Sequence, residues 1–302
     1  MHYEHIKNRK PDEFVRLTGV RRGTFEAMLQ ALHGQIRAFG RPPKLPLCDQ
    51  LLLTLMYWRE YRTLFHIASA YGLSEAPASR TVRRVENALM RSGRFTLPGK
   101  KALRPSEMVW QVVVIDATEC VIDATEWQKR PKKRQNFFSG KKKRHTLKAQ
   151  VVVEQQSGRI VVTAFCAGHT HDFALFKSSR LWLCEKSRCL ADAGYRGLNR
   201  WHQNSQTPHQ KSKHHPLTPE QKEDNRQWSS QRMVVEHALA RLKVFGILSG
   251  RYRNRRKRFG LRFNLLAAIS NHQLQSTPSI LMQEVFWKKQ SLPPARYPNR
   301  RR

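Results

Sequence analysis

Apolar side chains recur every three or four positions over most of residues 1–90, which is the spacing of amphipathic helices. Residues 1–40 contain two such runs, and Gly19 and Gly23 are expected to separate them. The segment 40–44, Gly-Arg-Pro-Pro-Lys, indicates a linker, and Asp49 is a suitable N-cap for the helix that follows it. The N-terminal part of the chain is therefore expected to be helical.

Two further helices are expected on either side of a short turn. The first covers Phe65–Ala70, Gly72 allows a left-handed turn, and Ser74 is a good N-cap for a second helix that continues to about Met90. This second helix presents a basic face formed by Ser79, Arg80, Arg83 and Arg84. A plain helical hairpin would show the same pattern, but the basic face favours a helix-turn-helix that contacts DNA.

From about residue 109 the helical spacing gives way to short runs of β-branched residues. Four strands are expected, at Val109–Ile115, Thr146–Val153, Arg159–Cys166 and Arg188–Ala191. Residues 154–158 have the composition of a hairpin turn between the second and the third strand. Asp172 is a natural N-cap for a short helix, Phe173–Ser178, that precedes the fourth strand.

The last part of the chain is expected to be helical again. A polar loop rich in His and Lys occupies most of 202–224, and a helix without Gly or Pro follows over Arg232–Lys243. A final apolar helix is expected over Asn264–Leu274. Three strands, a helix, a strand and a later helix are the order of an RNase H-like α/β fold, in which helices flank a mixed sheet.

One face of the Arg232–Lys243 helix combines a carboxylate with two cations. At about 100° per residue, Arg232, Glu236 and Lys243 lie close together on this face, beside an apolar stripe that can pack on a core. An ordinary surface helix with an Arg–Glu pair four residues apart has the same pattern. Taken alone, the motif favours that ordinary interpretation.

Two further carboxylates follow predicted strands. Asp116 ends the apolar strand Val112–Ile115, and Asp192 ends the strand Arg188–Ala191. If the two strands are neighbours in one sheet, both carboxylates lie at its carboxyl edge, where α/β active sites form, and Glu236 could complete a triad. Three converging carboxylates need a divalent cation, and oxygen ligands suit Mg²⁺ or Mn²⁺. Taken singly, each acid also has an ordinary interpretation: Asp116 and Asp192 as turn formers at strand ends, and Glu236 as part of a surface ion pair.

Length and charge narrow the class of protein. A chain of 302 residues accommodates two domains, and a hydrophobic content of 39% supports a packed core. The 56 basic residues outweigh the 22 acidic ones, and the resulting charge of +34 makes nucleic acid the expected partner. We expect no membrane partner, because the sequence has no long apolar span, no lipidation signal and no secretory signal. The five cysteines lack CxxC spacing and indicate reduced thiols of a cytosolic protein.

Several stretches of the chain together match a known pattern. In the C-terminal half they are IDATE (115–119), RPKKRQNFFSGKKKRHTLKAQVVV (130–153), GHTHDFALFK (168–177), LADAGYRG (190–197), NRQWSSQRMVVEHALARLKVFGIL (225–248) and RYRNRRKRFGLRFNLLAAISN (251–271). The N-terminal half contributes DQLLLTLMYWREYRTLFHIASAYGLSE (49–75). With these stretches the chain resembles bacterial insertion-sequence transposases of the DDE class, in the group related to Harbinger elements.

The resemblance implies an RNase H-like domain in which Asp116, Asp192 and Glu236 bind two divalent metal ions and are catalytic. The related signature Arg-x3-Glu-x6-Lys is met by Arg232, Glu236 and Lys243, whose cations would contact phosphates. The implied partners are double-stranded DNA, both element ends and target, and further copies of the chain on that DNA. The implied location is the bacterial cytoplasm, in association with the nucleoid.

The chain departs from the family pattern near the first acid of the triad. IDATE is repeated at 122–126, so Asp123 is a rival for the first metal ligand. Asp116 is preferred because the longer β-branched run precedes it and because Cys120-Val-Ile then continues as in the family. Ser229 stands where some relatives have a tyrosine, three residues before Arg232.

Basic runs flank the predicted site in the sequence. Arg130–Arg144 and Arg251–Arg262 are expected to hold the DNA backbone, and solvated surface or a supporting helix face is the alternative. The first run ends in Lys141, Lys142, Lys143 and Arg144. His171 and Asp172 are expected either to support the site or to contact metal or DNA directly.

These observations lead to one expected organisation. It comprises a helix-turn-helix DNA-binding domain at 1–93, a linker at 94–108, an RNase H-like catalytic domain at 109–274 and a basic, disordered tail at 275–302. We expect a transposase that cleaves element ends by metal-assisted hydrolysis, after which the freed 3′-hydroxyl attacks target DNA. The alternatives are a decayed or repurposed DNA-binding protein and a nuclease without strand transfer.

Overall fold

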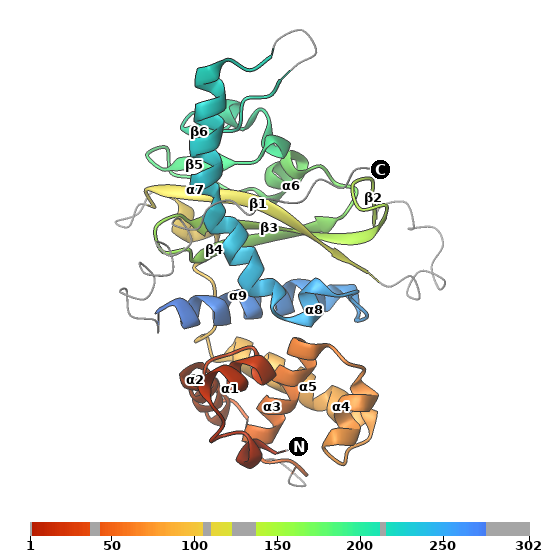
Figure 1. Cartoon of the computed structure of the whole chain (residues 1–302). Helices are drawn as coiled ribbons and strands as arrows, with labels where there is room; N and C mark the ends of the chain where they lie inside the picture. Colours follow the sequence, from red (N-terminus) through yellow and green to blue (C-terminus); the bar gives the residue numbers. More distant parts are fainter. Residues whose placement is uncertain (1, 37–42, 105–109, 123–136, 212–215, 276–302) are drawn as a thin grey trace, which may run out of the picture.

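The structure, a computed structural model, describes residues 2–36, 43–104, 110–122, 137–211 and 216–275. Asp123 with the rest of the repeated IDATE lies outside the described residues, as do parts of the predicted linkers (40–42 and 105–108), part of the first basic run (130–136) and the predicted tail from 276. The N-terminal helices gather below a mixed sheet, and two C-terminal helices lie between the two parts (Figure 1).

The N-terminal helices pack around α3, which is buried from Asp49 to Trp58. Their bounds are α1 (Pro11–Thr18), α2 (Arg22–His33), α3 (Leu47–Glu60), α4 (Leu64–Ala70) and α5 (Glu75–Arg91), after a short 3-10 turn η1 (Tyr3–His5). Gly19 ends α1 with a left-handed φ of 78°, as predicted. Gly23, in contrast, lies inside α2, because the second position of a helix tolerates glycine when the flanking residues pack.

The N-cap expected at Asp49 is wrong. The N-cap of α3 is Pro46, and Asp49 lies in the first turn. Its carboxylate accepts a hydrogen bond from the backbone N–H of Tyr3 at 2.6 Å and pairs with the His2 ring at 2.6 Å. The acid therefore ties the start of the chain to α3, which the local sequence alone could not indicate.

The helix-turn-helix prediction is confirmed in α4 and α5. Gly72 joins them with a φ of 62°, and Ser74 occupies the N-cap position of α5. The inner face of α5, which includes Val82, Val85 and Leu89, is buried against the other helices. Its opposite face is left to solvent over Arg80 and Arg83.

In the described part of the chain, six strands form one mixed sheet. The strands are β1 (Val112–Val121), β2 (Phe138–Ser139), β3 (Arg144–Glu154), β4 (Ile160–Ala167), β5 (Arg188–Ala191) and β6 (Ser205–Gln206). β1 is central, because it pairs antiparallel with β3 on one side and parallel with β5 on the other. β4 pairs with β3 through the predicted hairpin, and β6 continues the sheet beyond β5.

Alternate residues of β1 face two different cores. Val113 and Ile115 pack with Phe176 of α6 (Asp172–Ser179) on one side of the sheet. Val114 packs on the other side, in the larger core that also contains Val235 of α7 (Pro219–Lys243). Because side chains alternate along a strand, this pattern decides which core each later residue of β1 faces.

The C-terminal helices are longer than the sequence pattern indicated. α7 begins at Pro219, inside the predicted polar loop, because Thr218 and Gln221 form a capping box and Pro219 takes the first helical position. α8 (Gly246–Ser249) and α9 (Phe259–Gln275) follow. The other short 3-10 turns are η2 (Lys100–Leu103), η6 (Ala193–Tyr195), η7 (Leu198–Arg200) and η8 (Arg256–Arg258).

The mixed sheet between helices confirms the predicted fold class.

A buried ion cluster joins the helical part to the C-terminal helices. Glu86 of α5 is fully buried, and its carboxylate accepts hydrogen bonds from Arg258 at 2.7 Å and from Arg262 at 2.6 Å. The indole N–H of Trp58 donates to the same carboxylate at 3.3 Å. Gly19 lies against Phe245, where a Cβ atom would come within 2.6 Å of the ring. The two parts therefore share one continuous core.

We predict that Glu86→Gln lowers the free energy of unfolding by about 3–5 kcal/mol, because it leaves the buried guanidinium of Arg262 and the half-buried one of Arg258 without their counter-charge. Urea denaturation of the full chain measures this change. Glu75→Gln, on the exposed first turn of the same helix, is the matched control and should change the free energy by less than about 0.5 kcal/mol. Equal effects of the two substitutions would contradict the structural role of Glu86.

Candidate active site

Asp116 and Asp192 occupy neighbouring positions on adjacent parallel strands. The last paired residues of β1 and β5 are Ile115 and Ala191, so the two aspartates come next on each strand. Both follow residues that face the α7 side of the sheet, Val114 and Leu190, at a spacing of two. Strand pairing and side-chain alternation therefore put both carboxylates on the same side of the sheet.

The expectation that Asp116 ends its strand is wrong. β1 continues to Val121, because its pairing with β3 extends from Asp116 opposite Val151 to Val121 opposite Thr146. Only the pairing with β5 stops before Asp116. Asp116 thus lies within a central strand, at the point where β5 turns away, and its backbone is held by hydrogen bonds to β3.

Arg232 brings α7 into contact with this pair of carboxylates. Its guanidinium lies 3.1 Å from a carboxylate oxygen of Asp192, and its side chain is 14% exposed. The Nε of the same guanidinium is buried, with no hydrogen-bond partner among the described residues. Arg232 therefore supplies positive charge directly beside the acids, and its buried Nε–H is an unsatisfied hydrogen-bond donor.

The Asp116 carboxyl has a strongly perturbed pKa. Burial raises the pKa to about 6, and the neighbouring carboxylates of Asp192 and Asp172 add to the rise. The backbone N–H of Ala117, which donates to the carboxylate at 2.7 Å, and the charge of Arg232 act in the opposite direction. A half-buried acid whose charge is disfavoured is typical of a site that binds a cation or a proton.

Glu236 lies one helical turn beyond Arg232 and is exposed. α7 runs beside β1. Burial raises the pKa of Asp116 near the start of this contact, and the charge of Arg232 lowers it. At the other end, burial raises the pKa of the Cys120 thiol, and the charge of Lys243 lowers it. Glu236 lies between these two points on the helix. The described residues contain no group of three side chains already placed to hold a metal ion. The structure thus brings together Asp116, Asp192 and Arg232, and leaves Glu236 nearby in solvent.

Lys148 forms an ion cluster beside the acids that the sequence did not reveal. Its ammonium donates to Asp172 at 2.7 Å and to the carbonyl oxygen of Thr170 at 2.6 Å, and it lies 3.8 Å from Glu119. The available signal was a single lysine within β3, three residues before the apolar run Val151–Val153. Gly194 allows the close approach of this cluster, because a Cβ there would lie 2.7 Å from Asp172 Oδ2.

Asp172 is not the N-cap of α6. That position belongs to His171, which is exposed, and Asp172 is the first helical residue. Its carboxylate is engaged by Lys148, and its charge contributes to the raised pKa of Asp116. This arrangement supports a role for Asp172 in holding the surroundings of the site.

The predicted DNA-binding cations have different environments. Arg80, Arg83 and Lys243 are exposed, as are the four residues of the basic turn that leads into β3: Lys141, Lys142, Lys143 and Arg144, the first residue of β3. Arg84 is half-buried and donates a hydrogen bond to Gln50 at 2.6 Å. In the second basic run, Arg258 and Arg262 are engaged by Glu86, so this part of the run supports the fold.

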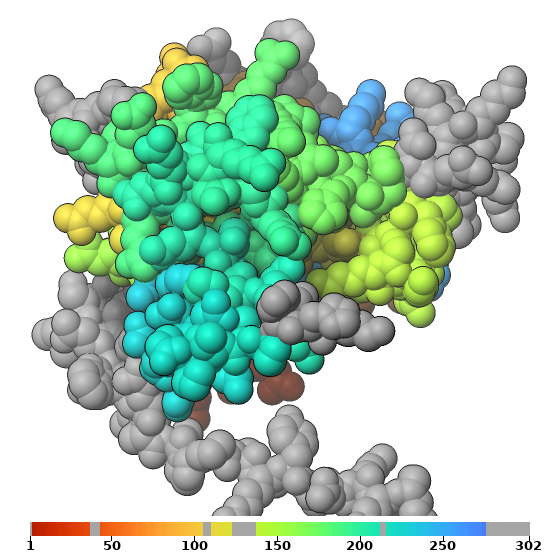
Figure 2. All heavy atoms as spheres, turned by 90° about the horizontal axis from the view of Figure 1, so that it is seen from above, coloured from red at the N-terminus to blue at the C-terminus, as the bar shows by residue number. Residues whose placement is uncertain are grey.

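The face of the molecule opposite the helical part is formed by α6, the segment after β5 and the N-terminal part of α7 (Figure 2).

The described helices include none that is long and apolar enough to span a bilayer.

Comparisons with known proteins match both parts of the chain. A family model described as "DDE superfamily endonuclease" matches residues 115–271, and one described as "Helix-turn-helix of DDE superfamily endonuclease" matches residues 43–95. The chain is 45% identical, over 278 residues, to a protein of Microchaete diplosiphon named as a probable transposase for insertion sequence element IS702. That match covers 91% of this chain and 99% of the relative.

A second relative comes from Streptomyces albus G, and its name gives the same assignment for insertion sequence element IS112. It is 27% identical over 214 residues, which cover 69% of this chain and 73% of the relative.

We predict that Asp116→Asn stabilises the protein at neutral pH in buffer containing EDTA. Because the folded-state pKa of about 6 lies above the ordinary value of 3.8, ionising Asp116 opposes folding, and this penalty grows as pH rises from about 4 to about 6. The variant should gain on the order of 1–3 kcal/mol over the parent at pH 7.5 and nothing at pH 3.5. Chemical denaturation at the two pH values measures the difference. A gain that is equal at both values would show that titration of Asp116 is not its cause.

Proposed function

Because the chain belongs to the transposase family of DDE endonucleases, we propose that it cleaves the ends of a mobile DNA element and joins the freed 3′-hydroxyl to target DNA. Family membership supports transposition by a nuclease. The observation that carries the residue-level proposal is the pair Asp116, on β1, and Asp192, directly after the paired part of β5, with Arg232 of α7 bound to Asp192. We assign the catalytic triad to these two aspartates and Glu236.

The donor set fits a divalent metal ion. DDE endonucleases depend on such an ion. Burial, and to a smaller extent the neighbouring carboxylates of Asp192 and Asp172, raises the pKa of Asp116, and a bound divalent cation would favour the charged form that both effects disfavour. Asp116 and Asp192 would hold the metal with Glu236, and oxygen-only ligands favour Mg²⁺ or Mn²⁺, with two ions as the family pattern implies. The metal would supply Lewis acidity at phosphorus and lower the pKa of the attacking hydroxyl or water.

The residues of the chain have distinct parts in this proposal. Glu236 is exposed on α7, so a side-chain rotation toward Asp116 and Asp192 involves no loss of buried contacts. Arg232 and Lys243 lie on the same helical face and would contact the phosphates that flank the cleaved bond. Lys148 and Asp172 hold the backbone after β4 in place.

DNA recognition is assigned to the helix-turn-helix. α5 would enter the major groove with Arg80 and Arg83, while Arg84, engaged by Gln50, holds the helix and contacts DNA less directly. The exposed turn with Lys141, Lys142, Lys143 and Arg144 would hold the backbone without reading bases. Because two element ends must be joined to one target, the active form on DNA is expected to be a homo-oligomer.

We predict that Asp116→Ala, Asp192→Ala and Glu236→Ala each abolish metal-dependent cleavage of end DNA while leaving DNA binding intact. Each substitution removes a metal ligand and no DNA-reading group. Gel assays of cleavage, with Mg²⁺, Mn²⁺ or EDTA, and binding assays with the same duplex measure the two activities. Glu223→Ala, an exposed acid on the same helix as Glu236, is the matched control.

Asp123→Ala, tested beside these variants, decides which copy of IDATE supplies the first ligand. Retained cleavage by Asp192→Ala would remove the triad assignment. If no preparation cleaves but all bind end DNA, the alternative of a non-catalytic DNA-binding protein is favoured.

We predict that Arg80→Ala or Arg83→Ala in the full chain weakens binding to the selected site by about 1–3 kcal/mol and relaxes the preference at one base pair. The site is obtained by selection from random duplexes. Arg84→Ala should affect stability more than preference, since its guanidinium is held by Gln50. Arg16→Ala, exposed on α1, is the control. Unchanged preferences in the Arg80 and Arg83 variants would exclude α5 as the reading helix.

A further inference from the structure

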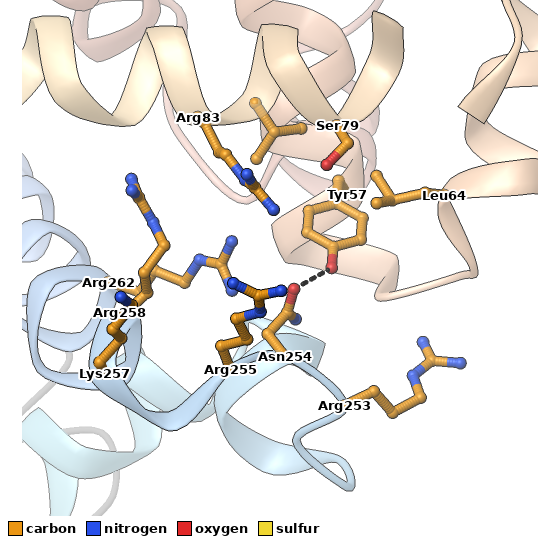
Figure 3. Close-up of a pocket in the computed structure, with 11 residues that line it drawn as sticks. Tyr57, Leu64, Ser79, Arg83, Arg253, Asn254, Arg255, Lys257, Arg258 and Arg262 are labelled. Atoms are coloured by element: carbon orange, nitrogen blue, oxygen red, sulfur yellow. Dashed lines mark hydrogen bonds between the residues drawn. The ribbon is translucent and has the colours of Figure 1, made fainter. Parts of the chain in front are cut away.

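A cleft of about 380 Å³ lies between α5 and the Arg253–Arg258 segment that follows α8 (Figure 3). Its walls come from the two parts of the molecule: Ser79 and Arg83 project from α5, and Arg255 and Lys257 from the opposite segment. Tyr57 lies at its inner end, where its hydroxyl donates to Asn254 at 3.0 Å. The cleft is therefore lined by both the DNA-reading helix and the part of the chain that carries the active site.

The cleft has an excess of positive charge. Its lining includes six cations and no carboxylate among the described residues. Arg258 and Arg262 are compensated by the buried carboxylate of Glu86 behind the wall. Arg253 lies over the Tyr61 ring and donates to the carbonyl oxygen of that residue.

Three of the lining cations have no counter-charge of their own. Arg83, Arg255 and Lys257 are exposed, and none of them forms an ion pair within the described part of the chain. Like charges held close together repel each other unless an anion lies between them. The fixed walls thus maintain a local field that a polyanion would neutralise.

The positive surface continues around α5. Arg83 also lines a second hollow, on the outer face of the helix, together with Arg80, Arg84 and Arg91. A helix inserted in the major groove of B-DNA lies between two phosphate backbones, which are about 12 Å apart across the groove. Cations beside such a helix are therefore placed to meet one backbone while its outer face meets the bases.

We propose that this cleft binds the phosphate backbone of the same DNA duplex whose major groove α5 enters, with Arg255 and Lys257 as the phosphate contacts. The proposal rests on the proposed function and adds a second DNA contact from the part of the chain that carries the active site. Glu86 and the Tyr57–Asn254 bond fix the two walls, so the cleft is formed before DNA binds. Binding there would set the direction in which the duplex leaves the reading helix.

The test compares two double variants of the full chain that each remove two exposed positive charges. Arg255→Gln/Lys257→Gln changes the cleft, and Lys186→Gln/Arg200→Gln removes the same charge from a surface distant in sequence and outside the cleft. Binding to a random-sequence 30-base-pair duplex is measured by fluorescence anisotropy over a range of KCl concentrations. Random sequence suffices because phosphates carry no base information.

Each phosphate contact contributes about −0.9 to the slope of log K against log salt, so the cleft variant should have a slope less steep by about 1.8. Relative to 1 M salt, this corresponds to a loss of roughly 60-fold in affinity at 0.1 M. The control variant should keep the parent slope.

Circular dichroism and thermal melting should be the same for all variants, because the replaced side chains are exposed and form no internal ion pair. An unchanged slope in the cleft variant would overturn the cleft proposal while leaving the proposed function in place. An equal change in both double variants would also overturn it, since it would show only a general effect of net charge. If the parent chain does not bind duplex DNA, the proposed function and the cleft proposal both fail.

Discussion

The arrangement of the molecule depends on one buried carboxylate. Glu86 lies on the inner face of α5, and the hydrogen bonds it accepts from Arg258 and Arg262 attach the helical part to η8 and α9. An ion cluster of this kind gives little net stability compared with an apolar core, but it penalises any arrangement that separates its members. The angle between α5 and the sheet is therefore fixed by charge as well as by packing.

The candidate site depends on strand pairing in a similar way. Parallel pairing of β1 with β5 puts Asp116 beside Asp192, and antiparallel pairing with β3 holds the backbone of Asp116 on its other side. α7 then contributes Arg232 across the face of the sheet. Of the three proposed ligands, Asp116 thus lies within the central strand and Asp192 directly after its parallel neighbour, whereas Glu236 is exposed on α7.

The sequence predicted those features that local chemistry decides. The strand predicted at Arg159–Cys166, the turn at Gly72 and the basic face of α5 agree with the structure, because β-branched runs, left-handed glycines and helical spacing act over a few residues. It could not predict that Arg262 would turn inward to Glu86, or that Lys148 would be compensated by Asp172. These contacts join residues distant in the chain, and the same residue types are also common on solvated surfaces.

The two faces of α5 are subject to different constraints. Its inner face must match Trp58, Arg258 and Arg262, and a change there requires compensation in both parts of the chain. Its outer face, which includes Arg80 and Arg83, has no such obligation. With α5 as the proposed reading helix, related elements can diverge in the DNA they recognise by exchanging outer residues one at a time. Transplanting the whole helical part would also require the matching surface of η8 and α9.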